Sequence, residues 1–61
     1  MSRPWTAAGL AALAVLSLAG EGLAEMAEAL GRTPGEIDLA LWTLVGRTPV
    51  EALDLLQRQA A

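Results

Sequence analysis

The sequence contains no cysteine, histidine, lysine, tyrosine or phenylalanine among its 61 residues. The absence of cysteine excludes a disulfide framework, and the absence of both cysteine and histidine excludes the usual ligands of a zinc site. Few residues are β-branched and only two are aromatic, which disfavours a β-sheet. Because a chain this short buries only roughly 60% of its unfolded surface, its stability must come from efficient helix packing or from self-association.

Positive charge is also scarce, since the formal net charge is −3. A protein that binds nucleic acid mainly through phosphate contacts usually carries a positive field, which this chain lacks overall. The only cations are Arg3, Arg32, Arg47 and Arg58. The acidic residues are expected to form a solvated surface; they are Glu21, Glu25, Glu28, Glu36, Asp38, Glu51 and Asp54.

No residue pattern predicts catalysis. Ser17 and the threonines have no histidine or lysine to activate them, and no nucleophile, general base or binding pocket can be assembled from the sequence. We therefore expect no enzymatic activity, no cofactor and no metal ion.

The N-terminal apolar run from Ala7 to Ala19 carries no charge, and Arg3 precedes it. Its end, Ser17-Leu18-Ala19, is similar to the small-residue cleavage site of a secretory signal peptide. Pro4 and Trp5, between the arginine and the run, are atypical of such a peptide. The run is also shorter than the ~20 residues that a membrane span needs. We expect a cytoplasmic protein without a membrane segment, with export as the alternative.

Residues that typically start or end helices divide the chain into four segments. Ala and Leu dominate the composition and favour helices. Thr6 can cap the first helix, and Gly20, Gly31 and Gly46 can end the first three. The sequence predicts one all-α domain covering residues 1–61, with helices at about 7–19, 23–30, 34–45 and 49–59.

The tetrapeptide Gly-Arg-Thr-Pro occurs twice, at 31–34 and 46–49. In each copy glycine can take the left-handed position after a helix, threonine can cap the next helix, and proline fits its first position. Glu36 and Glu51 complete two capping boxes. Arg32 and Arg47 are then solvated spacers or, alternatively, phosphate contacts beside a helix N-terminus.

Helical spacing assigns residues to faces. In the third helix Leu39 and Trp42 point away from the core, beside Asp38 and Thr43. Trp42 either packs under the fourth helix or belongs to a partner surface, whereas Trp5 is expected in the core. The first helix is apolar all round, so an exposed apolar patch is expected on it. The predicted core face of the third helix is Ile37, Ala40, Leu41, Leu44 and Val45, and that of the fourth is Ala52, Leu53, Leu55, Leu56 and Ala60.

From Trp5 to Leu44, about two-thirds of the chain, the sequence resembles bacterial Myb/SANT-like helix-turn-helix domains of the GcrA N-terminal type. The matching residues are Trp5, Thr6, Leu10, Leu13, Leu16, Gly20, Met26, Ala27, Leu30, Gly31, Arg32, Thr33 and Ile37. The resemblance implies a three-helix helix-turn-helix core, to which a fourth helix is added, and a third helix that lies in the major groove of DNA.

The residues that start this third helix depart from those that usually read bases. Arginine, asparagine and glutamine are absent there, and two carboxylates would be repelled by phosphates. The positions hold Thr33, Pro34, Gly35, Asp38 and Leu39, and the two carboxylates are Glu36 and Asp38.

Two functions therefore stay open. The resemblance favours a bacterial DNA-binding or transcription-associated regulatory module, which would contact nucleic acid through Arg3, Arg32, Thr33 and Arg47 and would need to oligomerise. The acidic charge favours the alternative, a protein-interaction module that has lost DNA binding. Such a module would be an obligate homo-oligomer or an accessory subunit that uses Leu39 and Trp42. We take the regulatory helix-turn-helix as the first prediction, because the resemblance covers so much of the chain.

Overall fold

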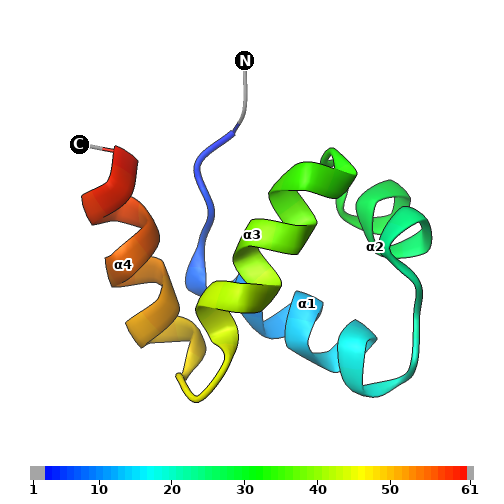
Figure 1. Ribbon diagram of the computed structural model, residues 1–61, viewed down its shortest axis with the longest axis horizontal. Coiled ribbons are helices and arrows are strands. Elements are labelled where there is room, and N and C mark those ends of the chain that lie inside the picture. The colour runs from blue at the N-terminus through cyan, green and yellow to red at the C-terminus, as the bar shows by residue number, and fades with distance from the viewer. Residues whose placement is uncertain (1–2, 61) are drawn as a thin grey trace.

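The computed structural model describes residues 3–60, with the side chain of Ala60 outside the described part, and these residues form four helices and no strand. The helices are α1 (Ala7–Leu18), α2 (Leu23–Leu30), α3 (Pro34–Leu44) and α4 (Pro49–Ala60). The all-α fold class is thus confirmed, and every predicted boundary lies within one residue of the observed one. In Figure 1, α2 and α4 flank α3, and the N-terminal segment (residues 3–6) runs between α3 and α4.

The helix starts follow the predicted capping. The hydroxyl of Thr6 accepts a hydrogen bond from the backbone N–H of Gly9 at 3.0 Å. At α3 the Glu36 N–H donates to Thr33 Oγ1 at 3.2 Å, and the Thr33 N–H donates to Glu36 Oε1 at 3.1 Å. Thr48 and Glu51 repeat this exchange at α4, at 3.2 and 2.8 Å. Both predicted capping boxes are therefore present.

The core lies where α1, α3 and α4 meet and extends to α2. Helix α4 packs against both α1 and α3, so it closes the core. The small size of three of the buried residues lets the helices approach closely. The buried apolar residues are Leu10, Leu13, Met26, Ala27, Ile37, Ala40 and Ala52, and Trp5, Leu16, Leu30, Leu41, Leu44, Leu53 and Leu56 pack around them.

Two assignments on α3 were wrong. Val45 is 64% exposed, because α3 ends at Leu44 and the backbone of Val45 (φ −59°, ψ 118°) is no longer helical, which takes its side chain off the helical face. Thr43 is buried rather than outward. Its Oγ1 donates to the carbonyl of Leu39 at 2.8 Å, and this bond satisfies the hydroxyl inside the core.

The exposed apolar patch expected on α1 is confirmed. Val15 is 65% exposed and Leu18 is 89% exposed, while Leu10 and Leu13 on the same helix are fully buried. Among the described residues, no helix combines the length and hydropathy that a membrane crossing requires.

The Glu51 capping box makes stability depend on pH. The N–H of Thr48 donates to the Glu51 carboxylate and holds the pKa of Glu51 below its ordinary value of 4.5, helped by the Thr48 hydroxyl and by the charge of Arg47. Because the folded pKa lies below the unfolded pKa, the contribution is complete above the ordinary pKa and is lost as the pH falls through the folded pKa.

We expect Glu51→Gln to flatten the acid limb of the stability curve, since glutamine does not titrate. Thermal unfolding midpoints of both proteins, measured between about pH 7 and about pH 3, check this. Curves of identical slope below the ordinary pKa would contradict it.

Candidate functional site

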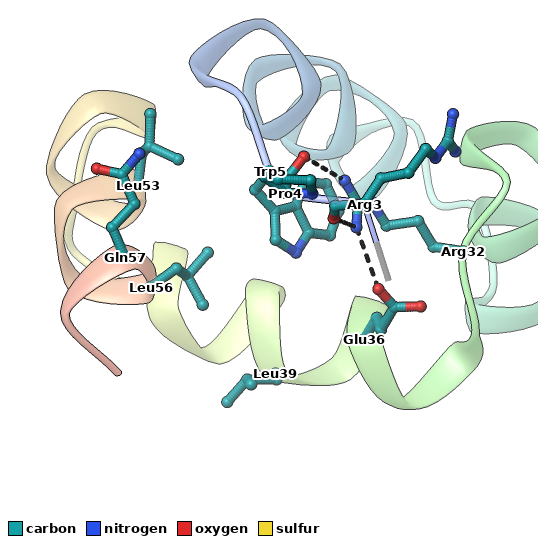
Figure 2. Close-up of a pocket in the computed structure, with 9 residues that line it drawn as sticks. All are labelled: Arg3, Pro4, Trp5, Arg32, Glu36, Leu39, Leu53, Leu56 and Gln57. Atoms are coloured by element: carbon teal, nitrogen blue, oxygen red, sulfur yellow. Dashed lines mark hydrogen bonds and ion pairs between the residues drawn. The ribbon is translucent and has the colours of Figure 1, made fainter. Parts of the chain in front are cut away.

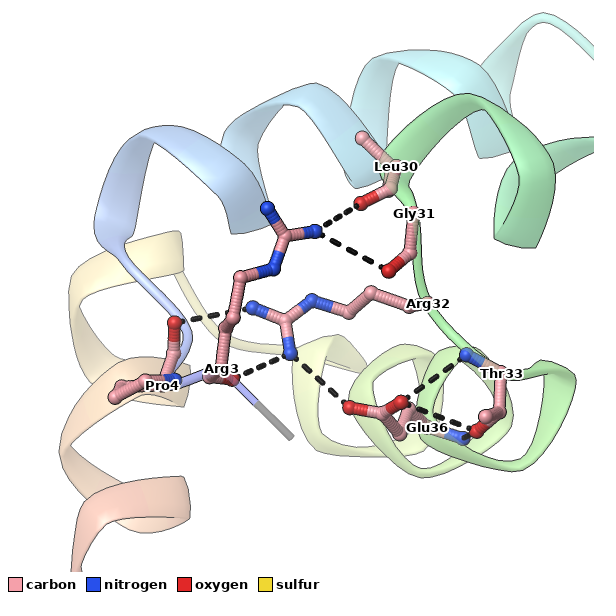
Figure 3. A network of polar contacts seen from close by, with 7 residues as sticks. All are labelled: Arg3, Pro4, Leu30, Gly31, Arg32, Thr33 and Glu36. Carbon is pink, nitrogen blue, oxygen red and sulfur yellow. Dashed lines mark hydrogen bonds and ion pairs between the residues drawn. The ribbon is translucent and has the colours of Figure 1, made fainter. Parts of the chain in front are cut away.

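Arg32 lies at the centre of a polar network that ties the N-terminal segment to the turn between α2 and α3 (Figure 3). Its Nη1 donates to the carbonyl of Arg3 at 2.6 Å and to Glu36 Oε2 at 3.1 Å, and its Nη2 donates to the carbonyl of Pro4 at 3.0 Å. The guanidinium carbon lies 3.9 Å from the centroid of the Trp5 ring, which is cation–π geometry. The side chain is only 9% exposed, so its interpretation as a solvated spacer was wrong.

Arg3 connects the same two parts of the chain, with its side chain reaching from the N-terminal segment to the end of α2. Its Nη2 donates to the carbonyls of Leu30 and Gly31, at 3.1 and 3.2 Å, at the end of α2. Last-turn carbonyls lack partners within the helix and carry partial negative charge, so an arginine there stabilises the helix end. Two features of the structure favour glycine at position 31. Its φ is +66°, and a Cβ there would lie 2.8 Å from Arg3 Nη2.

The other predicted nucleic-acid contacts are also engaged within the chain. Arg47 is exposed, and its Nη1 donates to the carbonyl of Thr43 at 3.2 Å, near the end of α3. Thr33 Oγ1 belongs to the α3 capping box. The structure thus gathers Arg3, Arg32 and Thr33 around one turn and leaves Arg47 at the next turn, which follows the other end of α3.

The helix face of α3 that points away from the core is exposed and carries two large apolar side chains and one carboxylate. We call it the α3 outer face and define it by Gly35, Asp38, Leu39 and Trp42. The indole of Trp42 is 70% exposed and Leu39 is 53% exposed, so Trp42 does not pack under α4. Trp42 also borders a shallow hollow of about 250 Å³, whose other lining residues are Asp38, Leu41 and Val45.

A larger hollow of about 360 Å³ adjoins the other side of this face (Figure 2). Leu39 lines it from α3, Leu53 and Leu56 from α4, and Pro4 and Trp5 from the N-terminal segment. Arg3, Arg32, Glu36 and Gln57 complete the lining. Leu39 therefore belongs both to this hollow and to the α3 outer face.

Helical spacing correctly predicted that Leu39 and Trp42 face outward, but it did not predict the hollow beside them. The hollow is assembled from segments up to about fifty residues apart in sequence, and no local pattern reports such a juxtaposition. In the sequence, the hollow was indicated only by Leu53 and Leu56, which lie on the broad apolar face of α4.

Within residues 3–60, no group of three or more metal-binding side chains comes together. Among the carboxylates with a described partner, Glu36 and Glu51 cap helices and Asp54 pairs with Arg58 at 3.0 Å on the surface. Comparison with known protein families, curated proteins and solved structures gives no match for this chain.

Proposed function

We propose that this protein is a regulatory protein-interaction module on a helix-turn-helix scaffold, and that the α3 outer face is its binding surface. The observation that carries the proposal is the exposure of Trp42 and Leu39 beside an apolar hollow. Tryptophan is enriched among the residues that dominate binding energies, and contiguous exposed apolar patches mark interaction sites.

The charges support the same function. Each of the four arginines forms a hydrogen bond or an ion pair within the chain: Arg3, Arg32 and Arg47 with backbone carbonyls and Arg58 with Asp54. Asp38, in contrast, is an exposed carboxylate on the α3 outer face. Phosphates placed along this face would meet that negative charge before any positive one. DNA binding through Arg3, Arg32, Thr33 and Arg47 stays a prediction, which the same experiment tests.

The experiment screens the purified protein against a displayed library of short amphipathic helical peptides, because exposed apolar grooves commonly bind such helices. We expect selected peptides to bind the wild type and to lose affinity by about tenfold or more with Trp42→Ala. Leu18→Ala is the matched control: it removes another highly exposed apolar side chain, from α1. It should leave peptide affinity unchanged.

A random-sequence DNA duplex is titrated in parallel at roughly 50 mM and 200 mM salt. No binding is expected at either concentration. The proposal is overturned if no peptide is selected, or if selected peptides bind Trp42→Ala as well as wild type. Duplex binding that weakens steeply with salt and is lost in Arg47→Ala would instead support the DNA-binding prediction.

A further inference from the structure

The N-terminal segment lies on the folded helices without forming a helix or a strand itself. Among the described residues, its backbone N–H groups donate no hydrogen bond. It is held instead by the hydrogen bonds that Arg3 and Pro4 make with the turn at residues 30–32, and by the contact of Trp5 with Arg32 and the core. Segments near a chain end that have few backbone hydrogen bonds open at a lower free energy than packed helices.

The same segment separates two hollows. One is the hollow of about 360 Å³ that adjoins the α3 outer face. The other, of about 310 Å³, extends toward Thr6, Gly9 and Leu30. Both hollows are lined by the same four residues, which are Arg3, Pro4, Trp5 and Arg32. The docked segment is therefore the partition between the two hollows, and its departure would merge them.

The segment is also a wall of the larger hollow. Pro4 and Trp5 lie on one side of this hollow, and Leu53 and Leu56 of α4 lie on the other (Figure 2). Without the two N-terminal residues, the hollow loses an apolar wall and becomes a more open surface, against which a partner buries less apolar area. Because Leu39 belongs to both the hollow and the α3 outer face, a partner on that face reaches this wall.

We propose that the N-terminal segment opens and closes as a unit while the four helices stay folded, and that a partner on the α3 outer face binds the docked form. This inference rests on the proposed function and adds its regulation. The apparent affinity for the partner then scales with the docked fraction of the protein. By reciprocity, a bound partner favours docking by the same factor.

Arg3→Ala tests the first half of the inference. It removes the hydrogen bonds to the carbonyls of Leu30 and Gly31, and so weakens docking. Fluorine NMR of the protein labelled with fluorotryptophan gives one signal for each of its two tryptophans. Trp5 is half-buried and reports docking, whereas Trp42 is already 70% exposed. In a urea series, the Trp5 signal should reach its exposed position before the helical circular dichroism falls, and earlier still in Arg3→Ala.

The second half is tested with a helical peptide selected by the screen described above. In the absence of urea, Arg3→Ala should bind this peptide about threefold or more weakly than wild type. The Arg3 guanidinium lies on the far side of the segment from Leu53 and Leu56 (Figure 2), so the loss reflects docking. Saturating peptide should also return the Trp5 signal of this variant to the docked position. Loss of a direct peptide contact alone would not produce that return.

Arg58→Ala is the matched control. It also removes one arginine and one positive charge, but Arg58 pairs with Asp54 on α4 and lines neither hollow. It should change neither the Trp5 signal nor the peptide affinity.

The inference is overturned if the Trp5 and helical signals change at the same urea concentrations in both proteins, because the segment then does not open separately. It is also overturned if Arg3→Ala opens earlier but binds the peptide as tightly as wild type. Both results leave the proposed function intact, provided that Trp42→Ala still weakens peptide binding. A screen that selects no peptide overturns the proposed function and, with it, the regulation.

Discussion

Replacing Arg32 by alanine is expected to lower the free energy of unfolding by about 2–3 kcal/mol, because the guanidinium makes several charge-assisted hydrogen bonds while largely shielded from water. The change removes bonds to the carbonyls of Arg3 and Pro4, the ion pair with Glu36 and the contact with the Trp5 ring. For a domain of this size, such a loss lowers the melting temperature by roughly 10–20 °C. Urea unfolding followed by far-ultraviolet circular dichroism measures it.

The Arg58→Ala variant is the matched control. Arg58 pairs with Asp54 at 3.0 Å, in the same (i, i+4) spacing as Arg32 and Glu36, but the two side chains are 74% and 59% exposed. Water and salt screen such a pair, so its loss should change stability by no more than about 0.5 kcal/mol. Arg32→Lys should recover only part of the loss, because an ammonium cannot reproduce the planar fork of donors. An Arg32→Ala protein as stable as wild type would show that the guanidinium is not structural.

The contrast between these arginines shows what could be predicted from the sequence. The helix boundaries could, because each depends on residues within a few positions of one another: Thr33 with Glu36, Thr48 with Glu51, and Gly31 after Leu30. Capping is local chemistry, and its spacing can be read directly.

The Arg32 network could not be predicted, because Arg32 reaches the Arg3 carbonyl across 29 positions. Its hydrogen-bond acceptors in the N-terminal segment are the backbone carbonyls of Arg3 and Pro4, and because every residue carries a carbonyl, no residue type signals these contacts. The same limit applies to the hollow beside Trp5, whose walls come mainly from the N-terminal segment, α3 and α4. The errors at Thr43 and Val45 have another origin, because both residues were assigned from helical spacing alone. That spacing does not show that α3 ends before Val45. It also does not show that the Thr43 hydroxyl donates to a carbonyl of the preceding turn, which lets the side chain be buried.

Ala52→Asp is expected to unfold the entire chain. The side chain of Ala52 has no exposed surface and lies in the core between α4 and its neighbours α1 and α3. A carboxylate there has no described cation beside it, and an unpaired buried charge costs about 3–5 kcal/mol. A hydrophobic core of this size rarely supplies more than that. Circular dichroism should show loss of most helical signal, and proton NMR should show loss of amide dispersion.

Val50→Asp serves as the control on the same helix. Val50 is 68% exposed in the first turn of α4, where a negative charge interacts favourably with the helix N-terminus, so this variant should fold as well as wild type. The experiment also decides what α4 is for. The three-helix resemblance ends at Leu44 and leaves α4 as an appendage. If α4 is such an appendage, the circular dichroism of Ala52→Asp should lose only the helical signal of α4. The helices α1 to α3 should then still unfold in one cooperative transition. Loss of all four helices together would instead make α4 an integral part of the core, in keeping with the burial of Ala52 and the contacts of α4 with both α1 and α3.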